Sequence, residues 1–116
     1  MRLMLTALLL AGVVGCEAEK QLTPEEEVAL EKIRKAAEQG EARAQYRLGF
    51  MYANGNGVPH NYVEAYAWMS VAATNGNEDA KEFLPKAKAE LTREQLIAAQ
   101  IRAIELTEQI NANKAK

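Results

Sequence analysis

Few side chains in this sequence of 116 residues have the chemistry of a nucleophile or an acid–base catalyst. There is one cysteine, Cys16, one histidine, His60, and one aspartate, Asp79. Catalysis by general acid and base needs titratable groups held together in a concavity. His60 lies beside Pro59 with no cysteine, second histidine or Asp triad within motif reach, so we interpret it as a loop residue. Cys16 is therefore the residue whose surroundings indicate chemistry.

Cys16 follows a segment that is unlike the rest of the chain. Arg2 gives a short positive start, and residues 3–11 form an apolar run that only Thr6 interrupts. The run has the length of a signal-peptide core and is too short to span a bilayer. We expect residues 1–15 to be a signal peptide.

The four residues Val13-Val14-Gly15-Cys16 resemble the lipobox of bacterial lipoproteins at every position. The resemblance implies that the thiol takes a diacylglyceryl thioether, that the bond before Cys16 is cut, and that the new amino terminus is acylated. Residues 16–22 would then be the lipidated cysteine and its spacer. The alternative is that Cys16 is an ordinary buried or free thiol.

Lipidation would place the protein in a bacterial cell envelope. Each buried methylene contributes about 0.8 kcal/mol, so one acyl chain binds marginally while several anchor stably. Glu17 is not the Asp that typically retains such lipoproteins in the inner membrane, so the periplasmic face of the outer membrane is favoured. Loss of residues 1–15 removes Arg2 and no acid, which moves the formal charge from −2 to −3. Acids and bases interleave, so no basic surface exists for nucleic acid.

The elements that follow are predicted to be helices, because strong helix formers dominate and β-branched residues are scattered. Thr23 and Glu26 form a capping box, as do Thr92 and Gln95, and Asn61 can cap a third helix. Pro85 should kink its helix or delay its start. The expected helices cover residues 24–39, 41–53, 62–74, 78–90 and 93–111. Between the second and third, Asn54-Gly55-Asn56-Gly57-Val58-Pro59 has the composition of a reversing loop.

The last expected helix is apolar on more than one side. Leu96, Ala99, Ala103, Leu106 and Ile110 line one face. A second set widens the apolar arc beyond what one packing face requires: Ile97, Ile101 and Ile104.

An internal period organises the helices. Ala36-Ala37, Gly40, Ala44 and Leu48 recur at an offset of 36 residues as Ala72-Ala73, Gly76, Ala80 and Leu84. Periods in this range are typical of stacked helical hairpins. We predict an all-α fold, a short α-solenoid of antiparallel hairpins with a long C-terminal capping helix. Its domain spans residues 23–112, with a complete repeat at about 44–77 and a tail at 113–116.

The stretch from Ala44 to Tyr52, followed by Gly55, Gly57-Val58, Ala65, Trp68, Ala72-Ala73 and Gly76, resembles the Sel-one-like repeat, a relative of the tetratricopeptide repeat. The resemblance implies a scaffold for protein contacts, with the partner on the surface lined by first helices. By that analogy four residues point toward the groove: Arg43, Tyr46, Arg47 and Phe50. The alternative is that Tyr46 and Phe50 are packed, and Trp68 is expected in the core.

We predict no enzyme, cofactor or metal site. Gly55 and Gly57 do not have phosphate-motif spacing, and the β-lactamase-like relatives of this repeat have paired cysteines that this chain lacks. The leading hypothesis is a lipid-anchored module that binds a protein partner. A second is an obligate homo-oligomer or permanent subunit whose final helix makes the contact. A hydrolase is the third.

Overall fold

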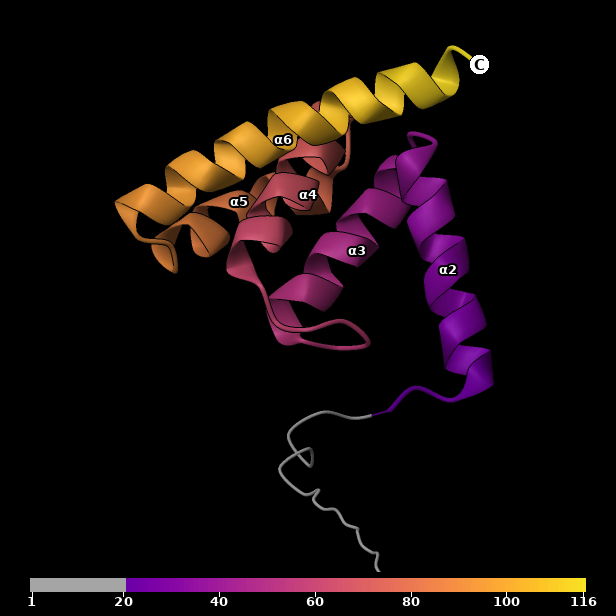
Figure 1. Cartoon of the computed structure of the whole chain (residues 1–116). Coiled ribbons are helices and arrows are strands. Elements are labelled where there is room, and N and C mark those ends of the chain that lie inside the picture. Colours follow the sequence, from indigo (N-terminus) through magenta and orange to yellow (C-terminus); the bar gives the residue numbers. More distant parts are fainter. Residues whose placement is uncertain (1–20) are drawn as a thin grey trace, which may run out of the picture.

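The computed structural model describes residues 21–116, which form five α-helices and no strand (Figure 1). The helices are α2 (Pro24–Glu38), α3 (Ala42–Asn54), α4 (Tyr62–Thr74), α5 (Glu78–Ala89) and α6 (Arg93–Lys114). The predicted all-α fold is confirmed. The predicted signal peptide and Cys16 lie outside the described residues.

The polar residues before the helices cap them as their types predict. Thr23 and Thr92 each form a complete capping box, with Glu26 and Gln95 at the third helical position. The side chain of Asn61 accepts a hydrogen bond from the Glu64 amide at 3.1 Å. The helix starts therefore follow from local chemistry in the sequence.

Of the two effects predicted for Pro85, the delayed helix start is wrong, and the kink stays a prediction. The side chain of Asn77 accepts from the Ala80 amide at 2.8 Å, and α5 runs without a break from Glu78 to Ala89. Ala80 and Ala87 are buried on either side of the proline, which is itself exposed. Packing before and after Pro85 thus holds the helix through the position where one backbone hydrogen bond is lost.

The period of 36 residues is visible in the backbone hydrogen bonds. At the end of α2, the Glu41 amide donates to Ala36 O at 3.0 Å and the Gly40 amide to Ala37 O at 3.1 Å. The same two bonds recur after α4, from Asn77 to Ala72 O at 2.9 Å and from Gly76 to Ala73 O at 3.0 Å. This is the Schellman end, which needs a glycine with positive φ, and Gly40 and Gly76 have φ of 101° and 99°.

One buried polar side chain, Gln45, joins the two ends. Its Nε2 donates to Ala37 O at 3.0 Å, and its Oε1 accepts from Asn75 Nδ2 at 3.0 Å. Gln45 is fully buried and is the one buried polar or charged residue among residues 21–116. It therefore ties the C-terminal ends of α2 and α4 to the start of α3.

The main core lies between the second helices of the hairpins and α6. Figure 1 shows α6 lying over α4 and reaching the C-terminal end of α2, where Asn113 Nδ2 donates to Glu38 O at 3.1 Å. The buried residues of this core come from α2, α3, α4 and α6: Ala37, Ala44, Leu48, Ala67, Trp68, Val71, Leu106 and Ile110. The expected core position of Trp68 is confirmed. Because α6 covers α4, it closes the solenoid at this end.

Replacement of Gln45 by leucine is expected to lower the free energy of unfolding by about 2 kcal/mol. The reason is that the Ala37 carbonyl and the side-chain amide of Asn75 both lose their hydrogen-bond partner. Thermal unfolding followed by circular dichroism measures the loss. The matched control is Lys81→Leu, 36 residues further on and exposed, which should change the unfolding temperature little. Equal effects of the two substitutions would show that Gln45 holds nothing together.

Candidate protein-docking surface

The four predicted partner-binding residues lie on one outer face of α3. Arg43, Arg47 and Phe50 are exposed and Tyr46 is half-buried. The face exists because Ala44, Gln45, Leu48 and Gly49 turn the opposite side of α3 inward. Residues three and four apart share a side of a helix, so the placement follows directly from the spacing.

The aromatic side chains of this face form a continuous cluster. The Tyr46 and Phe50 rings are stacked with centroids 6.1 Å apart, and Phe83 of α5 meets Phe50 edge-on at 6.0 Å. Tyr46 and Phe83 pack against a small second core of Met69, Ala72 and Ala80. Phe50 is 44% exposed, which is high for a residue of its type. Tyr46 is thus partly a packing residue, as the alternative held, while Phe50 is presented to solvent.

Sequence reasoning missed Phe83. Phe83 lies 36 residues after Arg47, so the period aligns it with Arg47, on the first helix of the next half-repeat. The repeat alignment therefore carried a signal that could have found Phe83. We call the surface formed by Arg43, Tyr46, Arg47, Phe50 and Phe83 the α3–α5 face.

The α3–α5 face is electropositive along α3. The helix carries Arg43 and Arg47 and no acidic residue. Neither arginine forms a salt bridge within residues 21–116. Two guanidinium groups beside an exposed aromatic ring favour a partner with carboxylates next to an apolar side chain, because arginine pairs bidentately with carboxylate.

A second apolar surface lies on α6, opposite the residues that this helix buries in the core. Ile97, Ile101 and Ile104 are 51%, 53% and 60% exposed, while Ala99, Leu106 and Ile110 on the opposite side are buried. We call this row of three isoleucines the α6 stripe. The two apolar sides expected for this helix are therefore present, and one of them is largely exposed in the described part of the chain.

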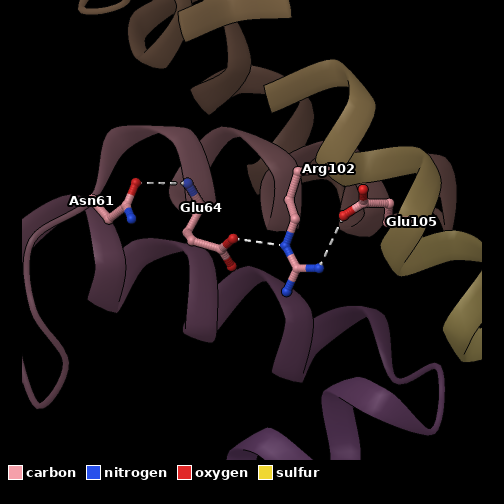
Figure 2. A network of polar contacts seen from close by, with 4 residues as sticks. All are labelled: Asn61, Glu64, Arg102 and Glu105. Carbon is pink, nitrogen blue, oxygen red and sulfur yellow. Dashed lines mark hydrogen bonds and ion pairs between the residues drawn. The ribbon is translucent and has the colours of Figure 1, made fainter. Parts of the chain in front are cut away.

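A polar network fixes the rotation of α6 and so determines where the stripe points (Figure 2). Arg102 Nε donates to Glu64 Oε2 at 2.7 Å, and its NH1 donates to Glu105 Oε1 at 3.4 Å. Burial by itself lowers the pKa of Arg102, but hydrogen bonding and the charge of Glu64 outweigh it, so the pKa is raised. Glu64 is in turn held by Asn61, which caps α4. The network links the start of α4 to the middle of α6.

A cavity of about 540 Å³ lies between α2 and the loop after α3. Apolar side chains from both elements line much of it, including Leu30, Ile33 and Val58, and His60 lies at its wall. The His60 ring meets the Tyr62 ring edge-on at 4.3 Å. Within residues 21–116 no three His, Cys, Asp or Glu side chains are grouped as a metal site would require.

No helix between residues 21 and 116 combines the length and the hydropathy that crossing a membrane would take.

Comparison with protein families identifies the repeat that the α3–α4 hairpin forms. The family model for the Sel1 repeat matches residues 42–77. Residues 42–77 of the chain are a Sel1 repeat. The search of curated proteins found no match to the chain.

The matched Sel1 repeat coincides with one structural unit. It comprises α3, the loop, α4 and the turn that leads into α5. The Sel1 repeat therefore supplies Arg43, Tyr46, Arg47 and Phe50, while Phe83 comes from the helix that follows it.

Exposure predicts that the α3–α5 face contributes little to folding. Phe50→Ala should lower the free energy of unfolding by under about 1 kcal/mol, because the ring is partly exposed and makes few core contacts. Leu48→Ala on the buried side of the same helix should cost about 3 kcal/mol. Chemical denaturation of both variants measures the difference. A Phe50→Ala cost that matched that of Leu48→Ala would make Phe50 a core residue.

Proposed function

We propose that this protein is a membrane-anchored module of the bacterial cell envelope that binds a partner protein on its α3–α5 face. The observation that carries the proposal is the exposed Phe50 ring, which stacks on Tyr46 and meets Phe83 edge-on. Arg43 and Arg47 lie on the same side of α3 and form no salt bridge within residues 21–116. Protein–protein interfaces concentrate their binding energy in aromatic residues and arginine.

The packing of the rings supports docking rather than a flexible contact. Tyr46 and Phe83 are anchored on the second core, so they hold Phe50 in place before a partner arrives. Ordering a side chain on binding costs about 0.5–1.5 kcal/mol, and a ring already positioned avoids much of that cost. The arginines at the edge would steer an acidic partner and fix its register.

The anchor rests on the lipobox-like sequence that ends at Cys16. A spacer of six residues, 17–22, separates Cys16 from Thr23, the cap of α2. An extended chain spans at most about 3.5 Å per residue, so such a spacer would hold the module within about 25 Å of the bilayer. Tethering would concentrate the α3–α5 face at the membrane surface, and Glu17 favours the outer membrane.

A scaffold role agrees with the distribution of titratable groups. The carboxylates of Glu25 and Glu27 occupy the first turn of α2, where they complement the helix dipole. His60, the sole histidine, contacts a tyrosine ring. Neither arrangement places an acid and a base together, so we propose no catalysis.

The exposed α6 stripe favours a second candidate function, that of a subunit in an oligomer or a permanent complex. Isolated apolar side chains are common on the surface of a monomer, whereas three exposed isoleucines in a row on one helix form a patch of the kind that marks an interaction site. In this case the stripe, rather than the α3–α5 face, would be the surface through which the module works.

The anchor is tested with Cys16→Ser. The variant is expected to move from the membrane fraction to the soluble fraction, because the diacylglyceryl thioether cannot form without the thiol and the later cleavage and acylation of the amino terminus do not follow. Immunoblotting of fractions after cell lysis measures the distribution. The control is Gln21→Ser, within the spacer, which should stay with the membrane. Retention of Cys16→Ser in the membrane would overturn the lipid anchor.

The docking face is tested by photo-crosslinking in intact cells with a benzophenone amino acid at position 50. An adduct with a partner protein is expected, and Arg43→Glu with Arg47→Glu in the same chain should reduce it at least about tenfold, because like charges would then meet. The matched control is the same probe at Val28, which is 58% exposed on α2. Equal adducts from both positions would contradict a specific face.

A further inference from the structure

We infer that Asn56 and Gly57, in the loop between α3 and α4 (Figure 1), form a site of spontaneous covalent modification. The side-chain amide of Asn56 is exchanged for a carboxylate in water, through a cyclic imide formed with the backbone nitrogen of Gly57. Neither the docking face nor the lipid anchor takes part in this reaction.

The chain offers three chemically equivalent pairs for this reaction, because three asparagines are followed by glycine: Asn54, Asn56 and Asn75. Glycine permits the reaction best, since it has no Cβ to hinder attack by its backbone nitrogen on the preceding side chain. All three asparagines are exposed, so water reaches each of them. Sequence and exposure therefore do not separate the pairs, whereas hydrogen bonding does.

The pair at the end of α3 is held by two hydrogen bonds. Asn54, the last residue of the helix, donates from its Nδ2 to Phe50 O at 2.9 Å. The Gly55 amide donates to Met51 O. The Gly55 nitrogen can attack only after both bonds break and the helix end unwinds, which makes this pair slow.

The pair that follows α4 is held in the same way. Asn75 Nδ2 donates to the side chain of the buried Gln45 at 3.0 Å. The Gly76 amide donates to Ala73 O at 3.0 Å, as part of the Schellman end of α4. Attack by the Gly76 nitrogen would break both bonds, so this pair is slow as well.

Asn56 and Gly57 have neither restraint. Within residues 21–116, the side chain of Asn56 makes no hydrogen bond and the Gly57 amide donates to no acceptor. The loop backbone is anchored on either side of the reacting atoms. The Asn56 amide donates to Met51 O at 3.0 Å, and the Asn61 amide donates to Tyr52 O at 2.9 Å. Rotation between these anchors brings the Gly57 nitrogen to the Asn56 side chain without breaking a hydrogen bond.

The reaction balances with water as its co-reactant. The Gly57 nitrogen bonds to Cγ of Asn56, and ammonia leaves with the proton that the backbone amide gives up. Water then adds to one of the two imide carbonyls and breaks its bond to nitrogen. Opening at the former side-chain carbonyl gives aspartate. Opening at the backbone carbonyl gives isoaspartate, in which the main chain runs through the side-chain carbon.

Conversion changes the wall of the cavity between α2 and the loop, which Asn56 lines together with Glu26. Both products place a carboxylate where a neutral amide was, across the cavity from α2. Isoaspartate also adds one methylene to the backbone two residues before Val58, which is buried. The isoaspartyl form is expected to unfold at a lower temperature than the unmodified protein, because the longer backbone displaces Val58.

The test is peptide mapping by mass spectrometry of the purified full-length protein after incubation at mildly alkaline pH in heavy-oxygen water. The heavy oxygen marks conversions that occur during the incubation. Asn56 is expected to convert at least about tenfold faster than Asn54 and Asn75, because two hydrogen bonds must break at each of those pairs. The labelled product should be a mixture of aspartate and isoaspartate, which chromatography separates.

The unfolded chain provides the matched control. In concentrated urea the three pairs lose their hydrogen bonds, so their conversion rates should become similar. Asn56→Gln should abolish conversion at this position in the folded protein, because the longer side chain closes an imide ring poorly. The circular dichroism spectrum of this variant should be unchanged, since the Asn56 side chain has no partner within residues 21–116.

Three results would overturn the inference. In the folded protein these are the absence of labelled product at Asn56, or conversion of Asn54 or Asn75 as fast as Asn56. A preference for Asn56 that persists in urea would show that local sequence, and not hydrogen bonding, sets the rates. Equal unfolding temperatures of the isoaspartyl and unmodified forms would overturn the expected displacement of Val58.

Discussion

The close approach of α3 and α4 is the constraint on which the rest of the structure depends. Gly49 lies against α4, where an added Cβ would come within 3.1 Å of Met69 Cγ and 3.2 Å of Ala65 O. An added Cβ would require the Met69 side chain and the α4 backbone at Ala65 to shift by a few tenths of an ångström. Glycine and alanine at this crossing let the two helices pack closely, as ridge-into-groove packing with small residues allows. Every further element is added to this hairpin.

Close packing on one side of each helix determines which residues the other side exposes to solvent. On α3, burial of Leu48 and Gly49 turns Phe50 and Arg47 outward. On α6, burial of Leu106 and Ile110 and the Arg102–Glu64 pair turn the isoleucine stripe outward. The docking surfaces are therefore consequences of the core, and no loop has to be ordered to make them.

Much of this arrangement could be predicted from local sequence. Capping boxes at Thr23 and Thr92 mark helix starts by chemistry confined to four residues, and the period of 36 residues predicts the stacked hairpins. Gln45 could not be assigned in the same way, because its role depends on which helices become neighbours, and Phe83 could have been found only through the period that aligns it with Arg47. The delayed helix start at Pro85 was wrong for a similar reason, since burial of Ala80 and Ala87 on either side holds the helix through the proline. Contacts between helices distant in sequence are set by packing, which single-residue rules do not contain.

The most direct test of docking through the α3–α5 face is oxidative footprinting of the aromatic side chains. Hydroxyl radicals label Tyr46 and Phe50 according to their solvent exposure, and mass spectrometry measures labelling in the intact envelope and in the purified protein. The account predicts that labelling of both rings falls several-fold in the envelope, while Tyr66 and Tyr62 on α4 label equally in both samples. Equal labelling of Phe50 in the two samples would contradict a docked face.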